Sequence, residues 1–421
     1  MFRFIHAADI HLDSPLHMLD VYEGAPVEEL RRATRRAFQN LVELSITESV
    51  DFVLIAGDLY DGDWKDYNTG LYLVSQMRRL READIPVCIV SGNHDAASKI
   101  TKTLRLPQGV NVFPADAPGT IPLHKQGVAI HGQSFPSPSV KRDLSLKYPS
   151  PLPGCFNIGM LHTCATGREG HEPYAPCTME GLRSKGYDYW ALGHVHKAEQ
   201  LLDDPLTLFP GNIQGRHIRE AGPKGCMLVS VDDTGRPQAE FRPLDVIRWF
   251  RVAVDVSVAE TGYDVVDLIR LRLEECLEEN EGLPLVIRVE LSGESSIHDE
   301  LYSQEERWTN EIRSAALDAG AGRIWIEKVR LNTERPLEAR LLRSASGPVY
   351  ELIEYIEELR SDPDQLKVLA QVLGDLMTRL PRELREGEEG IQPNDSKWLT
   401  GVLEKVRPML LCRLLGREGT P

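Results

Sequence analysis

The feature that most constrains the fold is a pattern repeated through the first 245 residues: a short apolar run that stops abruptly at Gly, Asp, Asn or His. The runs lie at residues 2–5, 52–55, 87–90, 158–161 and 187–192. Apolar runs of this length without polar alternation are typical of strands buried on both faces. Helical patterns at residues 28–49 and 68–83 lie between them, as the crossovers of an α/β sheet require. Functional groups of such sheets collect at the carboxyl ends of the strands.

The pattern changes after residue 245. Strand patterns at residues 250–256, 285–291 and 323–329 alternate with helical patterns at 264–279 and 305–319, which predicts a small α/β capping domain over residues 246–335. Only helical patterns follow, at residues 349–360, 364–380 and 395–415. We therefore expect three parts, residues 1–245, 246–335 and 336–421. The helices of the third part either dock a partner or pack on their own chain.

The charge of the chain is uneven. Its formal net charge is −16, of which residues 1–245 carry −5 and residues 246–421 carry −11. Such acidity argues against a protein that grips nucleic acid over its whole surface. No apolar run approaches the roughly 18 residues of a membrane-spanning helix, and the first dozen residues lack the unbroken apolar stretch of a secretory signal. The seven cysteines form no Cys-x-x-Cys pair, so we expect a soluble, reduced, cytoplasmic protein without membrane contact.

Side chains that bind metals directly follow the predicted strands. They are Asp9, His11, Asp58, Asn93, His162, His194 and His196. Asp9 and His11 would point the same way if their strand continued. Nitrogen and oxygen ligands without thiolate suit Mn²⁺ or Fe²⁺, can hold Zn²⁺, and are compatible with Mg²⁺. Seven ligands are too many for one tetrahedral ion and about right for two ions, which a shared carboxylate can bridge roughly 3.5–4 Å apart.

Each of these motifs has a purely structural alternative. Asp-x-His is common at strand ends, and Gly-Asp after a strand is often only a turn. Gly92-Asn93-His94-Asp95 is rarer, and the pair His194 and His196 is moderately specific. The ordered set of five motifs, each after its own buried strand, is what indicates a metal centre.

The ordered series resembles that of the calcineurin-like metallophosphoesterases. Residues 4–12, Phe-Ile-His-Ala-Ala-Asp-Ile-His-Leu, look like the opening of the SbcD-type DNA repair exonucleases. Residues 210–217, Pro-Gly-Asn-Ile-Gln-Gly-Arg-His, are similar to the segment that closes their active site. The sequence of this segment most resembles that of the bacterial YhaO branch. The resemblance implies a four-layer α/β sandwich of two mixed sheets flanked by helices, followed by a small α/β cap and a helical C-terminal segment.

The resemblance also implies roles for individual residues. Asp9, His11, Asp58 and His196 would hold one metal ion, while Asp58, Asn93, His162 and His194 would hold the other, with Asp58 as the bridge. His94 would be the catalytic histidine beside the scissile phosphate, oriented by Asp95.

One position departs from the family, and the substrate contacts rest on one segment. Some family nucleases carry a histidine three residues after the bridging aspartate, and this chain has Asp61 there. Arg216 and His217 are the candidates for substrate binding, because they lie in the segment that would close the site.

Three functions fit these observations. The leading hypothesis is a Mn²⁺-dependent DNA nuclease of DNA repair, an exonuclease or endonuclease that works with an ABC ATPase subunit of the SbcC type. The second keeps the chemistry but acts on nucleotides or phosphoproteins, as a phosphodiesterase or phosphatase. The third is a scaffold that keeps the fold without activity. DNA and the ATPase are the expected partners, and a homodimer is left open.

Overall fold

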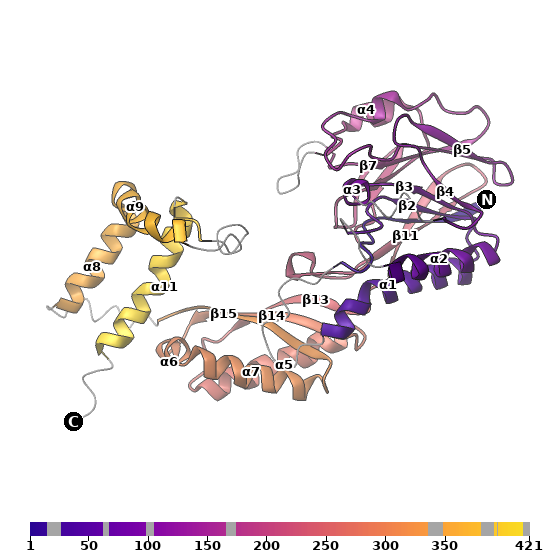
Figure 1. The fold of residues 1–421 in the computed structure, drawn as a ribbon. Helices are drawn as coiled ribbons and strands as arrows, with labels where there is room; N and C mark the ends of the chain where they lie inside the picture. The colour runs from indigo at the N-terminus through magenta and orange to yellow at the C-terminus, as the bar shows by residue number, and fades with distance from the viewer. Residues whose placement is uncertain are drawn as a thin grey trace. The chain divides into compact units, whose positions relative to one another are not determined.

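The computed structural model describes residues 1–14, 27–61, 67–97, 105–165, 174–335, 348–379, 391–393 and 395–415 (Figure 1). The chain divides into two compact units, Met1–Arg251 with Asn280–Ile287, and Val252–Glu279 with Arg288–Pro421. The division into three parts at residues 245 and 335 stays a prediction. No helix in the described ranges is long and apolar enough to cross a membrane.

The first unit contains two six-stranded sheets. One has the order β12-β11-β1-β2-β3-β4 and is formed by β1 (Phe2–Ala7), β2 (Phe52–Ala56), β3 (Val87–Val90), β4 (Val110–Val112), β11 (Gly225–Val231) and β12 (Pro237–Pro243). The other has the order β5-β6-β7-β8-β10-β9 and is formed by β5 (Gly119–Leu123), β6 (Val128–Gly132), β7 (Phe156–His162), β8 (Tyr189–Gly193), β9 (Glu199–Asp203) and β10 (Leu206–Phe209). Both combine parallel and antiparallel pairs, so the predicted fold class of two mixed sheets flanked by helices is confirmed.

Strand β2 shows why its apolar run lacks alternation. Val53 and Ile55 pack into the cluster formed with helices α1 (Val27–Thr47) and α2 (Tyr67–Glu82). Phe52, Leu54 and Ala56 point the other way, into the cluster shared with the second sheet. Both faces of β2 are therefore buried away from water, so an apolar side chain stabilises the fold on either face.

The second sheet is covered on its outer face. Trp190 and Leu192 of β8 pack with Leu182 of helix α4 (Met179–Ser184) in a further apolar cluster. The order of layers is thus helices, sheet, sheet, and then α4 with its loops. The carboxyl ends of β1, β2 and β3 lie at one edge of the first sheet and those of β7 and β8 at one edge of the second, and the two edges meet where His162 and Gly193 approach the backbone oxygen of Ala56.

The second unit is smaller and follows its predicted elements closely. A three-stranded sheet has the order β13-β14-β15, with β13 (Arg248–Asp255), β14 (Leu285–Glu294) and β15 (Ile324–Glu334), although the first residues of β13 and β14 are counted with the first unit. Its helices are α5 (Gly262–Glu279), the unpredicted α6 (His298–Ser303), and α7 (Glu305–Ala319).

The last helices are α8 (Pro348–Ser361), α9 (Pro363–Arg379) and α11 (Ser396–Leu415). Leu366 of α9 and Leu399 and Leu403 of α11 form a small buried cluster, so these helices pack on one another. Val368 and Val372, one turn apart on α9, are 61 % and 72 % exposed. The predicted apolar stripe therefore divides into a buried and an exposed part.

The two sheets approach each other closely at Gly193, the last residue of β8. A Cβ atom there would lie 1.9 Å from the backbone oxygen of Ala56, at the end of β2. Because the neighbour is backbone, we expect Gly193→Ala to lower the free energy of unfolding by about 2–3 kcal/mol, measured by denaturant unfolding. The control is Gly127→Ala, whose Cβ would meet nothing within 4 Å, and where only the φ of +65° opposes the change, at about 1 kcal/mol. Equal losses in the two variants would contradict this account of the contact.

Candidate metal centre

The chain turns sharply where the strands end. Strand β1 stops at Ala7, and Asp9 and His11 adopt positive φ of 50° and 45°, so the strand does not continue through them. Asp58 and His194, after β2 and β8, also have positive φ, of 51° and 104°. Such backbone costs on the order of 1–3 kcal/mol per residue and concentrates at functional sites. Four of the seven predicted ligands have this positive-φ backbone conformation.

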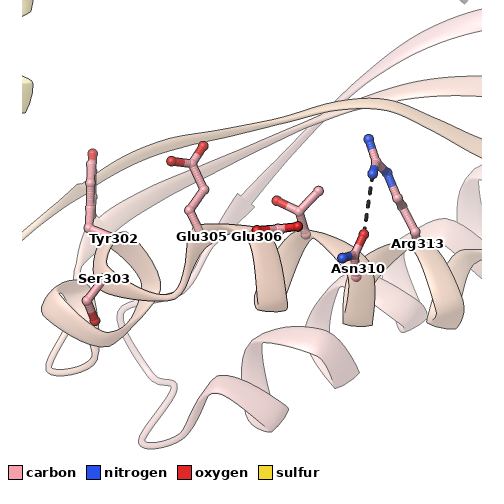
Figure 2. A pocket seen from close by; sticks show the side chains of 7 residues that line it. Tyr302, Ser303, Glu305, Glu306, Asn310 and Arg313 are labelled. Atoms are coloured by element: carbon pink, nitrogen blue, oxygen red, sulfur yellow. Dashed lines mark hydrogen bonds between the residues drawn. The ribbon is translucent and has the colours of Figure 1, made fainter. Parts of the chain in front are cut away.

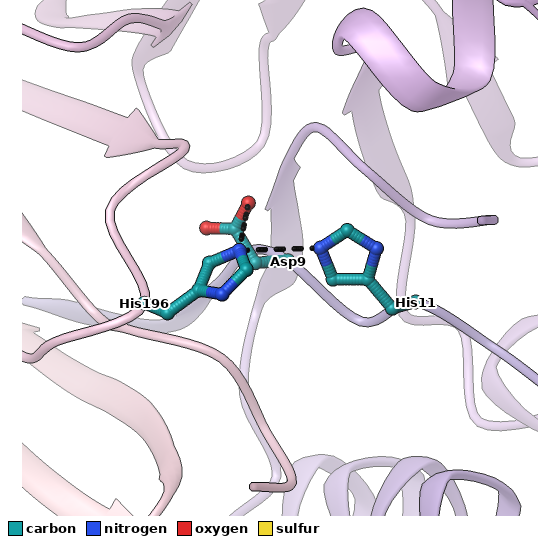
Figure 3. Close-up of side chains that lie close together, drawn as sticks. All are labelled: Asp9, His11 and His196. Carbon is teal, nitrogen blue, oxygen red and sulfur yellow. Dashed lines mark hydrogen bonds and ion pairs between the residues drawn. The ribbon is translucent and has the colours of Figure 1, made fainter. Parts of the chain in front are cut away.

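Asp9, His11 and His196 form the first cluster (Figure 3). Their ligand atoms all lie within 4.8 Å of one another, with 3.2 Å between the Nε2 atoms of the two histidines and 3.8 Å from His196 Nε2 to Asp9 Oδ1. Two neutral imidazole nitrogens repel at that distance unless a proton or a cation lies between them. A divalent ion about 2.0–2.1 Å from each nitrogen would satisfy both.

Asp58, His162 and His194 form the second cluster. His162 Nδ1 lies 2.9 Å from the backbone oxygen of Ala56, to which it can only donate, so Nε2 is the ring nitrogen that faces the cluster. That Nε2 lies 3.0 Å from Asn93 Oδ1 and 3.4 Å from Asp58 Oδ2.

The Asp58 carboxylate lies between the two clusters. Its Oδ2 is 4.0 Å from His11 Nε2 as well as 3.4 Å from His162 Nε2, and its Oδ1 accepts the backbone N–H of His94. The structure thus brings all seven predicted ligands together around these two clusters, and His94 lies equally close to His11 and Asp58 in a third group that overlaps both. Their division between two ions stays a prediction.

The charges of these groups fit divalent cations. Burial lowers the pKa of His11 to about 3, so its ring is neutral and free to act as a ligand. Burial opposes ionisation of Asp58, yet the neighbouring imidazoles, His162 foremost, hold its pKa well below the usual value. The same pairing outweighs burial at His162 and raises its pKa to about 9. Buried carboxylates beside imidazole nitrogens form a donor set that two divalent ions would neutralise.

His94 lies at the start of the short helix α3 (Asn93–Ala97), directly after β3. Its Nδ1 is 2.7 Å from Asp61 Oδ1, and this hydrogen bond raises the pKa of His94. Asp95 is buried and accepts the backbone N–H groups of Leu59, Tyr60 and Gly92 at 3.0–3.2 Å. The expectation that Asp95 orients His94 is therefore corrected: Asp61 does so, and Asp95 holds the loop after β2 against the loop after β3.

Asp61 is a site residue that sequence reasoning treated only as a departure from the family. Its Oδ2 accepts a hydrogen bond from Ser14 Oγ at 2.6 Å and lies 3.7 Å from Arg216 Nη1. Burial would raise the pKa of Asp61, but the ring of His11, whose Nδ1 lies 3.7 Å away, and hydrogen bonds from His94 and Ser14 hold it well below the usual value. The signal was present, because Asp61 completes the motif Gly-Asp-x-x-Asp that begins at Gly57.

Glu220 was missed entirely. It is 5 % exposed, and its Oε1 lies 2.6 Å from His196 Nδ1. Of the two residues predicted to contact substrate, Arg216 donates to Glu220 and to Ser14 Oγ, while His217 Nε2 lies 3.5 Å from Glu220 Oε1. No spacing in the sequence marks Glu220, since its partner His196 belongs to another loop.

A hollow on the second unit stands apart from this chemistry (Figure 2). It has a volume of about 500 Å³ and is lined by residues of α6 and α7, namely Tyr302, Ser303, Glu305, Glu306, Thr309, Asn310 and Arg313. Its lining contains no histidine or cysteine and none of the predicted ligands, so it adds nothing to the metal centre.

Two mixed sheets that bring buried carboxylates and imidazoles together beside the half-buried His94 are typical of a metal-dependent phosphoester hydrolase. The family model described as calcineurin-like phosphoesterase matches residues 2–198, and the middle domain of metallophosphoesterase YhaO matches residues 249–334. The uncharacterized metallophosphoesterase YhaO of Bacillus subtilis is 34 % identical over 294 residues, which cover 69 % of this chain and 71 % of that protein. The chain belongs to the calcineurin-like metallophosphoesterase family.

More distant relatives match as well. The DNA double-strand break repair protein Mre11 of Methanopyrus kandleri is 26 % identical over 355 residues, covering 77 % of this chain and 70 % of that protein. Mre11 of Saccharolobus solfataricus is 26 % identical over 220 residues, 48 % of this chain and 52 % of that one. Among solved structures, a dimetal phosphatase from Danio rerio aligns with a TM-score of 0.36 at 13 % identity, over 57 % of this chain and 99 % of that one.

Replacing Asp61 should remove the hydrogen bond that holds the imidazole of His94. We expect the pKa of His94 to fall in Asp61→Asn, because the carboxylate that stabilises the imidazolium is gone, and NMR titration of metal-free protein measures this directly. In the control Ser14→Ala the pKa should stay close to the wild-type value, since Ser14 bonds the other oxygen of Asp61. An unchanged pKa in Asp61→Asn would mean that another group holds the imidazole.

Proposed function

We propose that this metallophosphoesterase hydrolyses the phosphodiester bonds of DNA with two divalent ions, Mn²⁺ foremost, as a nuclease of the SbcD type in DNA repair. The observation that carries the proposal is the pair of ligand clusters joined by Asp58, with His94 and Arg216 beside them. The similarity to the Mre11 protein of Methanopyrus kandleri supports DNA as the substrate, since it extends over 355 residues, beyond the 2–198 range of the general family model.

The residues around the clusters have distinct tasks in this reaction. Two divalent ions held there would supply acidity to an attacking water and positive charge to the phosphoryl oxygens. His94, whose pKa is raised by the hydrogen bond to Asp61, would in its protonated form donate a proton to the departing 3′ oxygen or a hydrogen bond to an equatorial oxygen. Its side chain is 39 % exposed, so substrate can reach it. Arg216 adds a fixed positive charge near His94, through the shared partner Asp61.

The acidity of the chain does not oppose a DNA substrate once metals are bound. Residues 1–245 have a formal charge of −5, and two divalent ions would bring it to −1. The remaining acidic excess lies beyond residue 245. The nuclease part would grip DNA locally at the metal centre, and a partner would supply further affinity.

The partner that we propose is an ABC ATPase subunit of the SbcC type, docking on the last helices. The support is the exposed apolar surface there: Val368 and Val372 on α9, together with Tyr355 on α8, which is 53 % exposed. Solvent-facing apolar side chains one helical turn apart are a usual feature of helical docking surfaces.

Removing the imidazole of His94 should separate catalysis from metal binding. We expect His94→Ala to keep both ions and to lower kcat by about 10²–10⁴-fold, because His94 acts in the transition state and holds no metal. Metal content by mass spectrometry and turnover of bis-p-nitrophenyl phosphate measure the two properties. The control is His124→Ala, at an exposed histidine. Loss of metal in step with activity would show that His94 is a ligand.

The substrate is tested with purified protein and Mn²⁺ on duplex DNA, single-stranded DNA and bis-p-nitrophenyl phosphate, with and without the ATPase. We expect cleavage of DNA as well as of the small diester, with the ATPase increasing DNA cleavage. Turnover of the small diester alone in every condition would favour nucleotides or phosphoproteins as substrates. No turnover of any substrate with both metals bound would favour a scaffold.

A further inference from the structure

Glu220 links two parts of the site. Its buried carboxylate accepts from four donors: His196 Nδ1 at 2.6 Å, the Arg216 backbone N–H at 2.8 Å, Asn212 Nδ2 at 2.9 Å and Arg216 Nη2 at 3.2 Å. We propose that Glu220 is a positioning residue that fixes both the metal-facing nitrogen of His196 and the substrate-facing guanidinium of Arg216. The inference rests on the proposed role of His196 as a metal ligand.

The contact with His196 sets its tautomer. A carboxylate 2.6 Å from a ring nitrogen must accept a proton from it, so Nδ1 carries the hydrogen and Nε2 presents its lone pair. That Nε2 faces His11 and Asp9 in the first cluster. Arg216 Nη2 also approaches Nδ1, but at 3.4 Å, and it is better placed to donate to Glu220. A carboxylate behind a ligating histidine is the usual device for orienting the ring and raising its basicity.

The guanidinium of Arg216 is held from two sides. Glu220 Oε1 lies 3.2 Å from Nη2, and Asp61 Oδ2 lies 3.7 Å from Nη1, which also donates to Ser14 Oγ. The side chain is 14 % exposed, and its Nε has no hydrogen-bond partner among the described residues. A buried donor without a partner is costly unless a ligand completes it, and a phosphate oxygen has that chemistry.

The backbone of Glu220 is held in place by hydrogen bonds of its own loop and of Trp249, so Glu220 does not shift readily when a side chain bonded to it moves. The loop closes through a hydrogen bond from the Glu220 N–H to His217 O, in the short helix η2 (Ile218–Glu220). Trp249, which is 2 % exposed, donates from Nε1 to Gly215 O and accepts from the Gly222 N–H. The Glu220 carboxylate is therefore fixed in position and can orient the side chains of both His196 and Arg216.

The test is Glu220→Gln, which keeps the shape and removes the charge. Either amide orientation fails: an NH₂ group facing His196 would reverse the ring tautomer, and one facing Arg216 N–H and Asn212 would set donor against donor. Calorimetric titration of metal-stripped protein should show two Mn²⁺ sites in the wild type. In Glu220→Gln one site should weaken about 10–100-fold while the other stays unchanged. At saturating Mn²⁺, KM for bis-p-nitrophenyl phosphate should rise more than kcat falls.

Three comparisons keep the outcomes distinct. Glu240→Gln, at a residue of β12 whose side chain is 70 % exposed, should bind Mn²⁺ as the wild type does. Glu220→Asp, which keeps the charge one methylene further away, should bind Mn²⁺ more tightly than Glu220→Gln. His196→Ala should lose the same site that Glu220→Gln weakens. If His196→Ala keeps both sites, the metal assignment fails and the inference with it.

Two results with Glu220→Gln would overturn the inference while leaving the metal assignment intact. Two sites of wild-type affinity would show that Glu220 does not position His196. Equal weakening of both sites, together with a lower melting temperature, would show that it only holds the loop.

Discussion

The contact between the two sheets at the end of β2 is the constraint on which the metal centre depends. Gly193 leaves space for the carbonyl of Ala56, and the same carbonyl accepts the Nδ1 proton of His162 from β7. Gly57 makes a second close approach, since a Cβ atom there would lie 2.2 Å from His162 Nδ1. Small residues thus let strands from different sheets end within bonding distance of each other. Ligands on both sheets can then surround one small volume.

Much of this could be predicted from the sequence, because burial on both faces leaves a local signal. The strand predicted at residues 87–90 and the helix at 305–319 match β3 and α7 residue for residue. The strands β4 to β6 and β9 to β12 were not predicted. Of these, β4, β5, β9 and β12 are partly exposed and lack an unbroken apolar run, whereas β6, β10 and β11 are buried and were missed all the same. The ligands themselves were visible because each follows a buried strand directly, so the topology alone brings them together.

The orientation of side chains beyond those strand ends could not be predicted in the same way. Asp95 is adjacent to His94 in the sequence and yet bonds backbone N–H groups, whereas Asp61, 33 residues earlier, reaches the imidazole from the loop that follows the turn at Asp58. Glu220 depends on two loops meeting, His196 on one and Glu220 on the other. No periodicity encodes that distance.

The clamp formed by Trp249 has a consequence for where the catalytic part of the chain can be cut. Gln214 accepts a hydrogen bond from the Val246 N–H and donates one to Ile247 O, and Trp249 Nε1 donates to Gly215 O. The loop that carries Arg216 is therefore held in place by residues beyond the predicted boundary at residue 245. Arg248 in turn donates to Asn280 Oδ1, from the returning segment Asn280–Ile287. A truncation at residue 245 would keep every proposed ligand and still loosen the loop that orients one of them.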